Sequence, residues 1–250
     1  MDWSLSKMNR IEKAKSNIST NDLKALLPFY GITDKERTEE LVALARATRQ
    51  SPQLRSDVAP AELLELIEYE STASAVSQFE PMFVPGILQT EEYASAVLQF
   101  FYDEKAANER VAAMVELRTR RRELLTRENP PRFSFVLDES VIHRLVGGPS
   151  VTSRQLRHLV NVAEPPNVTI QIVPFAAGLH PGMKGPFEIV QFDDEPDENI
   201  VFLENSRGDI ISDDPEETRN YLKVFKRITE ASLESSDSVG LLRKSAGEVT

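Results

Sequence analysis

The chain has 250 residues, no cysteine, 40% hydrophobic residues and a formal net charge of −11. The lack of cysteine excludes disulfide bonds and thiolate chemistry, and the acidic balance argues against nucleic-acid binding by the chain as a whole. No apolar run reaches the length of a signal peptide or a membrane span, so we expect a cytoplasmic protein with no membrane partner.

The charge is distributed unevenly along the chain. Residues 1–55 contain ten Lys and Arg against seven Asp and Glu, whereas residues 56–250 contain nineteen against thirty-three. Such an asymmetry suggests a nucleic-acid-binding module in the basic part. We expect a partial DNA-binding module at 1–55, a folded ligand- or partner-sensing body at 56–235, and a polar tail at 236–250.

The first predicted element is a short helix. Leu5, Met8 and Ile11 recur at helical spacing and would face a core. The opposite face is polar and basic, which suits a recognition helix, because Lys and Arg neutralise phosphates while short polar groups reach base edges. A solvated basic face is the alternative. The residues predicted to contact DNA are Ser4, Ser6, Lys7 and Arg10.

This segment resembles part of a known DNA-binding domain. The order S-x-S-K-x-N-R-I-E, then D-L-K-A-L-L-x-x-Y-G-I-T-D, is similar to the later half of a helix-turn-helix domain. The class is the phage-repressor-like (XRE-type) one of actinobacterial regulators, in which the helix ending R-I-E is the recognition helix. That class places two helices before it, and this chain starts at Met1 with the recognition helix, so we expect weak DNA binding. The resemblance also implies a homodimer, since such proteins match paired half-sites.

The body begins with a predicted helix followed by a stretch rich in helix breakers. Pro60 suits the first position of a helix, and apolar residues extend this helix prediction as far as Phe79. Between Glu80 and Gly86, two prolines and a glycine exclude a regular helix. Five apolar residues in and around this stretch predict a buried loop, and Thr90 is placed to cap the next helix. An exposed connection between helices is the alternative.

Predicted helices and strands then follow one another at irregular intervals along the chain. Residues 168–173 alternate strictly between apolar and polar side chains, which is typical of a half-buried strand. The expected helices lie at 91–102, 105–127, 140–146, after 150 and after 215, and the expected strands at 132–137, 168–173, 187–192, 200–204 and 210–211. This order favours an α+β fold with a small, mainly antiparallel sheet behind the all-α helix-turn-helix remnant.

The body resembles the uncharacterised C-terminal domain that accompanies this helix-turn-helix class. The motif F-E-P-x-x-V-P-G-I-L-Q-T-E-E-Y-A begins at Phe79, and R-x-x-R, V-L-D-E and V-T-I-Q-I-V-P-F-x-A-G-x-H follow at Arg118, Val136 and Val168. One departure is Arg122, where the family commonly has glutamine. The resemblance covers most of the body and implies a domain that senses a ligand or binds a partner protein.

Charged groups beside apolar segments are the candidate binding residues. A partly buried carboxylate needs a cation, so we expect Glu80 or Glu139 to pair with Arg118 or Arg121, which share one helix face. A structural ion pair that joins helix and loop is the simpler alternative. His180 lies between two glycines in a loop after a strand, and we expect it on a movable lid. The predicted ligand-binding residues are Glu80, Tyr93, Arg118, Arg121, Glu139, Phe175 and His180.

The chain contains no hydrolase motif, no phosphate loop and no histidines at metal-ligand spacing, so we expect no cofactor and no metal. The favoured function is a helix-turn-helix transcription regulator whose C-terminal domain senses a small molecule or a small partner protein. The alternative is a small-molecule binder, or a lyase- or cyclase-type biosynthetic enzyme, descended from such a regulator without DNA binding. Its acid–base residues would be Glu80, Glu139 and His180.

Overall fold

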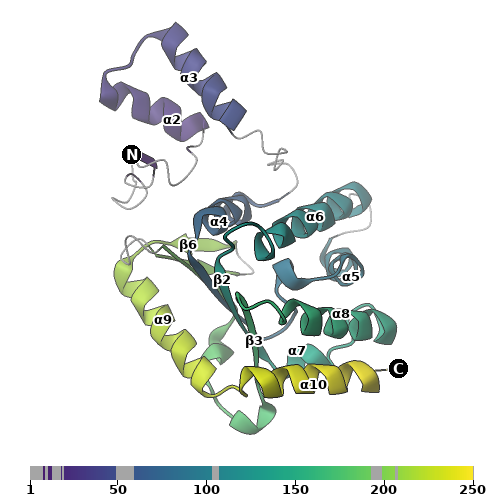
Figure 1. The fold of residues 1–250 in the computed structure, drawn as a ribbon. Helices are drawn as coiled ribbons and strands as arrows, with labels where there is room; N and C mark the ends of the chain where they lie inside the picture. Colours follow the sequence, from purple (N-terminus) through teal and green to yellow (C-terminus); the bar gives the residue numbers. More distant parts are fainter. Residues whose placement is uncertain are drawn as a thin grey trace. The chain divides into compact units, whose positions relative to one another are not determined.

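The computed structural model describes residues 20–48, 59–102, 107–192, 199–205 and 208–249, together with Met8, Ile11, Glu12 and Ile18. The chain divides into two compact units, Met1–Asp57 and Val58–Thr250, and each is described here by itself (Figure 1). The four residues predicted to contact DNA, Ser4, Ser6, Lys7 and Arg10, lie outside the described residues.

The described part of the first unit is helical. Its elements are α2 (Thr20–Leu26), the 3-10 turn η1 (Leu27–Tyr30) and α3 (Lys35–Thr48). Gly31 ends η1 with φ 74°, a left-handed conformation that glycine adopts without a steric penalty. Asp34 accepts a hydrogen bond of 2.7 Å from the backbone N–H of Arg37, which satisfies a donor at the start of α3. The end of η1 and the start of α3 are thus both explained by residues adjacent to them in the sequence.

In the part of the chain that the structure describes, the second unit is built around a six-stranded sheet in the order β3-β2-β1-β4-β5-β6. The strands are β1 (Ala75–Glu80), β2 (Arg132–Asp138), β3 (Val168–Val173), β4 (Phe187–Gln191), β5 (Ile200–Leu203) and β6 (Ile210–Ser212). Strands β1, β2 and β3 are parallel, and the β1–β4, β4–β5 and β5–β6 pairs are antiparallel. The predicted α+β class, with a mainly antiparallel sheet, is confirmed.

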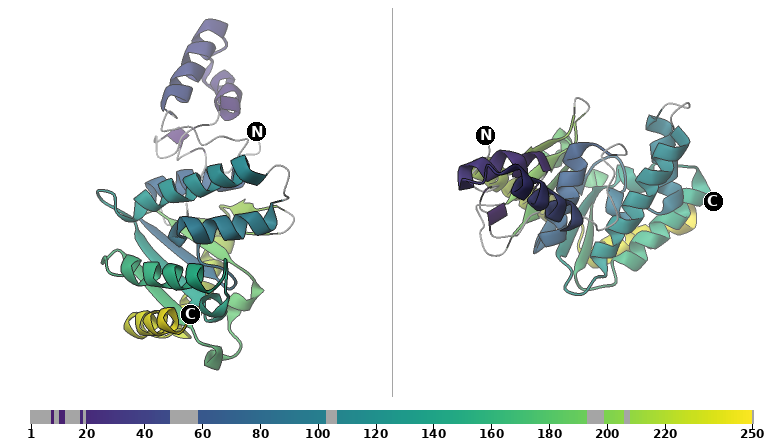
Figure 2. Two further views of the ribbon diagram at one scale, coloured as in Figure 1. Left: turned by 90° about the vertical axis from the view of Figure 1, so that its right-hand side faces the viewer. Right: turned by 90° about the horizontal axis from the view of Figure 1, so that it is seen from above.

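Helices cover both faces of the sheet. They are α4 (Ala61–Thr72), α5 (Glu91–Phe101), α6 (Ala107–Arg121), α7 (Ser140–His143), α8 (Pro149–Val162), α9 (Pro215–Glu230) and α10 (Ser235–Glu248). Single 3-10 turns are η2 (Gly86–Leu88), η3 (Arg122–Leu125), η4 (Phe175–Ala177) and η5 (Pro181–Lys184). Helix α9 lies on one face, and α5, α6 and α8 lie on the other (Figures 1 and 2). Among the described residues, no helix has the length and apolar character needed to cross a membrane.

The two faces of the sheet have separate cores. On the α9 side, Ile228 packs with Phe79 and Val136 in a smaller cluster. The larger cluster unites the opposite face of the sheet with residues of α4, α5, α8 and α10, including the fully buried Leu156 and Leu242. Both faces of the central strands are therefore buried, which leaves little room for polar residues unless they are paired.

The prediction that the helix from Pro60 continues to Phe79 is wrong. Helix α4 ends at Thr72, and Ala73 is already extended with φ −64° and ψ 150°. Residues 75–80 form β1, the strand between β2 and β4. A strand buried on both faces shows no apolar–polar alternation, so its sequence does not distinguish it from the end of a buried helix.

The expected polar tail after residue 235 is also corrected. Residues 235–248 form α10, which buries Leu242 and Ala246 against α8 and β3. The Ser238 hydroxyl accepts a hydrogen bond of 3.0 Å from the backbone N–H of Ile172 on β3. Helix α10 packs on the body with few large apolar residues, because its buried face also contains the small residues Ser238, Ser245 and Ala246.

Candidate ligand-binding site

The loop between β1 and α5 is buried, as the sequence predicts. Val84, Ile87 and Leu88 each have at most 1% of their surface exposed, although Met82 is 46% exposed. Gly86 begins the 3-10 turn η2, and Thr90 caps α5 by accepting a hydrogen bond from the N–H of Tyr93. The loop is therefore an ordered part of the core that can position side chains at its surface.

Side chains from neighbouring helices satisfy the backbone of this loop. Gln155 of α8 donates to the carbonyl of Leu88 at 2.8 Å and accepts from the N–H of Thr90 at 2.7 Å. The Tyr93 hydroxyl accepts from the N–H of Val84, and burial raises the pKa of Tyr93 to about 12. Tyr93, a predicted ligand-binding residue, thus supports the loop from within the core, and it is not among the residues that line the cavity described below.

Gln89 joins the loop to the arginines of α6 and η3. Its amide donates to the carbonyl of Val84 at 2.7 Å and accepts from Nη1 of Arg118 at 2.7 Å. Arg122, the departure from the family pattern, donates to the backbone carbonyl of Gln89. These contacts hold the guanidinium group of Arg118 beside the loop, and burial lowers the pKa of Arg118.

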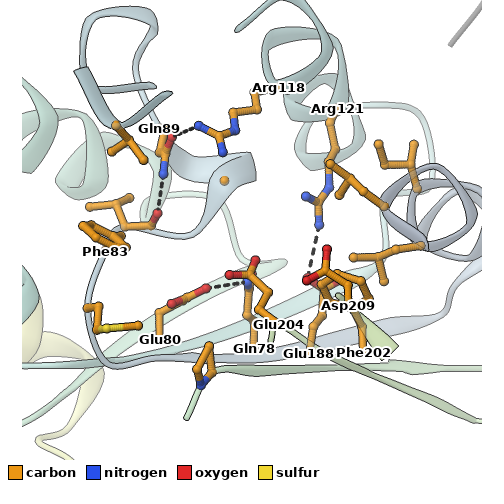
Figure 3. A pocket seen from close by; sticks show the side chains of 18 of the residues that line it. Gln78, Glu80, Phe83, Gln89, Arg118, Arg121, Glu188, Phe202, Glu204 and Asp209 are labelled. Atoms are coloured by element: carbon orange, nitrogen blue, oxygen red, sulfur yellow. Dashed lines mark hydrogen bonds and ion pairs between the residues drawn. The ribbon is translucent and has the colours of Figure 1, made fainter. Parts of the chain in front are cut away.

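A cavity of about 360 Å³ lies among this loop, the helices α4, α5 and α6, and the sheet (Figure 3). Its polar lining residues are Gln78, Glu80, Gln89, Arg118, Arg121, Glu188, Glu204, Asn205 and Asp209. Its apolar lining includes Leu63, Leu66, Ile67, Met82, Phe83, Val97, Phe101, Leu117, Pro186 and Phe202. Three predicted ligand-binding residues, Glu80, Arg118 and Arg121, therefore line one cavity.

Arg121 takes part in a buried ion network. It donates two hydrogen bonds to Glu70, at 2.5 and 2.6 Å, and a third to Glu188 at 3.1 Å. Burial alone would lower the pKa of Arg121, but Glu70 and Glu188 raise it above its ordinary value. The inward turn of an arginine is as predicted, whereas the expected partners Glu80 and Glu139 are wrong for Arg121. The actual partners come from α4 and β4.

A further buried acid, Glu80, lies beside this network, and Gln78 contacts it from the same sheet. Gln78 of β1 is directly opposite Glu188 of β4, and Gln78 donates a hydrogen bond of 3.3 Å to Glu80. Burial and the negative charge of Glu204 raise the pKa of Glu80 well above its usual value. Burial and the negative charge of Glu70 do the same for the pKa of Glu188. The floor of the cavity thus contains a cluster of buried carboxyl groups.

Glu204 and Asp209 add two further acids to the lining. Glu204 follows β5 and is exposed over much of its surface, but its side chain lies among the pocket residues (Figure 3). Burial of the carboxyl and the nearby Asp209 raise the pKa of Glu204. Sequence reasoning missed Glu70, Glu188, Glu204 and Asp209. An acid inside an apolar strand, as Glu188 is, was the one signal available for them.

Glu139 and Phe175 lie apart from the cavity, at the ends of β2 and β3. Glu139 accepts a hydrogen bond of 2.6 Å from the backbone N–H of Phe175. Its other oxygen is 3.3 Å from Nε2 of His143, whose ring stacks on Phe175 at 5.9 Å between centroids. The predicted grouping of Glu139 and Phe175 with Glu80 at one binding site is therefore wrong for this cavity: Glu139 organises the turn after β3.

His180 is not on an open lid. Its side chain is 3% exposed, with Nε2 at 3.4 Å from Asp138 and the ring packed edge-on against Phe79. Gly182 is held tightly too, since a Cβ atom there would approach the Phe79 ring to 2.5 Å. Gly182 therefore allows close packing, whereas a Cβ atom at Gly178 on the other side of His180 would meet nothing within 4 Å. His180 is not among the residues that line the cavity.

The comparisons with known proteins give a family for the second unit. Residues 63–244, well over half of the chain, match the family described as domain of unknown function DUF5753. No curated protein and no solved structure matches this chain. Within the part of the chain that the structure describes, no group of three or more His, Asp or Glu side chains could hold a metal ion. The chain belongs to the DUF5753 family.

Proposed function

We propose that this chain is a DNA-binding regulator whose DUF5753 unit takes up a small molecule in the cavity above the sheet. The observation that carries the proposal is the cavity itself, lined by buried acids, an arginine and apolar walls. Its volume of about 360 Å³ is in the range of small-molecule sites. Buried polar side chains are costly to a fold unless they are paired, so such a cluster at an open cavity supports a binding role.

The small-molecule part can be tested without knowing the natural ligand. A set of fluorine-labelled fragments, containing cationic, anionic and neutral compounds, would be screened by ¹⁹F NMR against the wild-type protein. We expect some fragments to bind and to lose binding in Leu63→Trp, which places a larger side chain in the cavity lining. Binding of no fragment of any charge, or binding unaffected by Leu63→Trp, would contradict a small-molecule site here.

The DNA-binding part of the proposal is supported by the basic segment 1–55 and by its resemblance to a recognition helix. Selection from random-sequence DNA duplexes at about 50 mM salt, where phosphate contacts are strong, should enrich one motif. Lys7→Ala should weaken binding to all sequences, whereas Arg10→Ala should also relax the preference among them. Lys35→Ala is the matched control, because Lys35 is an exposed lysine on α3 paired with Glu39. Failure to enrich any motif would leave the chain as a small-molecule binder alone.

The second candidate is an acid–base enzyme. The raised pKa of Glu80 inside the cavity favours it, because such a carboxyl retains its proton at higher pH than an ordinary glutamate and can serve as a general acid. The separation of Glu139 and His180 from the cavity removes the other two groups of the expected catalytic set. Mass spectrometry of each bound fragment after incubation decides between the candidates: a regulator returns the compound unchanged, and an enzyme alters it.

A further inference from the structure

We propose that the cavity is specific for a small organic cation, an amine or guanidinium group attached to an apolar body. This inference rests on the proposed small-molecule function and names the chemical class of the ligand. Three observations carry it: the excess of carboxyl groups in the lining, two buried oxygen atoms that lack donors, and the apolar side chains that make up the rest of the lining.

Carboxyl groups outnumber guanidinium groups in the cavity lining. Four carboxyl groups line the cavity, on Glu80, Glu188, Glu204 and Asp209, and only two guanidinium groups, on Arg118 and Arg121. Arg121 is already neutralised by a fifth acid, Glu70, through two hydrogen bonds behind the cavity wall. An anionic ligand would add another negative charge to this cluster, whereas a cationic ligand would reduce the repulsion.

Two buried acceptor atoms in the cavity lining have no hydrogen-bond donor among the described protein residues. Oε1 of Gln78 and Oε1 of Glu188 are both buried without a hydrogen-bond partner, and the two residues are cross-strand neighbours. An unsatisfied buried acceptor raises the free energy of the folded state, so a ligand that donates to these atoms would offset that cost. An ammonium group has three N–H donors and a guanidinium has five, and neither accepts hydrogen bonds.

Arg118 does not turn the cavity into an anion site. Its Nη1 is occupied by Gln89, and its Nε lies close to Gly86, where a Cβ atom would be 3.6 Å away. One half-buried guanidinium would have to offset four acids before it could favour an anion. We assign Arg118 instead to holding the loop and to offsetting part of the charge of Glu80 and Glu204.

The apolar wall explains why the cation should carry a hydrophobic body. Leu63, Leu66 and Ile67 of α4 and Val97 of α5 contribute apolar surface to the cavity lining, and Phe101 and Phe83 pack edge to face, 5.9 Å apart. A polyamine without an apolar part would leave these side chains in contact with water. Aromatic rings can also attract a cation through their faces.

Proton exchange provides an independent sign of cation binding. Burial raises the pKa of Glu80 and of Glu188, so both carboxyl groups retain a proton at higher pH than an ordinary glutamate does. A cationic ligand favours the ionised carboxylates and should displace these protons into solution. Binding should therefore release protons, and affinity should increase as pH rises towards the pKa of the free site.

Three compounds with the same skeleton test the proposal: 3-phenylpropylamine, 3-phenylpropanol and 3-phenylpropanoate, each titrated into the full chain by calorimetry. We expect the amine to bind at least about tenfold more tightly than the other two, a difference of about 1.4 kcal/mol. Titrations in two buffers of different ionisation enthalpy should reveal proton release with the amine. Equal or tighter binding of the acid, or amine binding without proton release, would overturn the proposal.

Variants identify the acids that recognise the cation. Glu80→Gln and Glu188→Gln should each weaken amine binding about tenfold and leave binding of the alcohol unchanged. Glu92→Gln, an exposed acid on α5 paired with Arg154, is the matched control. Glu80 has no ion pair to lose, so its variant remains informative even where Glu188→Gln impairs folding. If fragments bind but the amine shows no preference, the ligand class is wrong; if nothing binds, the small-molecule function itself is wrong.

Discussion

Gln78 and Glu188 are cross-strand partners on β1 and β4, and each keeps one buried oxygen without a hydrogen-bond donor. This pair lies in the middle of a sheet whose other buried residues on that face are mainly apolar. A fold does not gain stability from such an arrangement, because each unsatisfied polar atom raises the free energy of the folded state. Because the pair lies at the floor of a cavity, we attribute this unfavourable free energy to a role in binding.

The first prediction concerns stability against pH. Glu80 has a folded-state pKa raised above its usual value of 4.5, so the protonated carboxyl contributes stability that is complete below pH 4.5. That contribution is lost as pH rises through the folded-state pKa. Urea unfolding of the wild type should show stability that declines as pH rises above 4.5, and this decline should be smaller in Glu80→Gln. Glu92→Gln should follow the wild type, and identical profiles for wild type and Glu80→Gln would contradict the burial of Glu80.

The second prediction concerns the buried ion network. Arg121→Met leaves Glu70 and Glu188 without their cation, so the free energy of unfolding should fall by about 3–5 kcal/mol. Arg120→Met is the control, because Arg120 pairs with Glu116 on the exposed face of the same helix and should cost less than about 1 kcal/mol. Chemical denaturation at neutral pH measures both. Similar losses in the two variants would show that the network does not stabilise the interior.

The third prediction tests the tight packing around His180. A Cβ atom at Gly182 would be 2.5 and 2.6 Å from two Phe79 ring atoms and 3.0 Å from Ile228. Gly182→Ala should therefore reduce stability by about 1–3 kcal/mol through overpacking. Gly240→Ala has open space inside α10 and should instead increase stability by about 0.5–1 kcal/mol. A neutral effect of Gly182→Ala in thermal unfolding would restore the mobile loop that the sequence suggests.

The fourth prediction concerns Gly86 in the buried loop. A Cβ atom there would make ordinary contacts, at 3.6 Å from Arg118 and 3.7 Å from Arg121. Gly86→Ala should therefore change stability by less than about 0.5 kcal/mol. Gly86→Val adds methyl groups that would displace the guanidinium groups, at a cost of about 1–3 kcal/mol. Equal melting temperatures for the two variants would show that the arginines adjust freely.

Local sequence signals determined much of the secondary structure and the burial of the loop. Thr90 before two glutamates gives the start of α5, because a hydroxyl cap and the helix dipole act within one turn. Breakers among apolar residues predict the buried loop, since prolines exclude a helix while the apolar side chains favour the core. Irregular alternation of strand and helix patterns likewise gives the α+β class.

Only the tertiary structure decided which charged groups meet. Arg121 is 51 residues from Glu70 and 67 from Glu188, and no spacing rule connects them. They are brought together because α4, which carries Glu70, leads into β1, and β1 pairs with β4, which carries Glu188. Sequence periodicity records whether a side chain is buried, whereas the partner of a buried charge depends on contacts between distant segments.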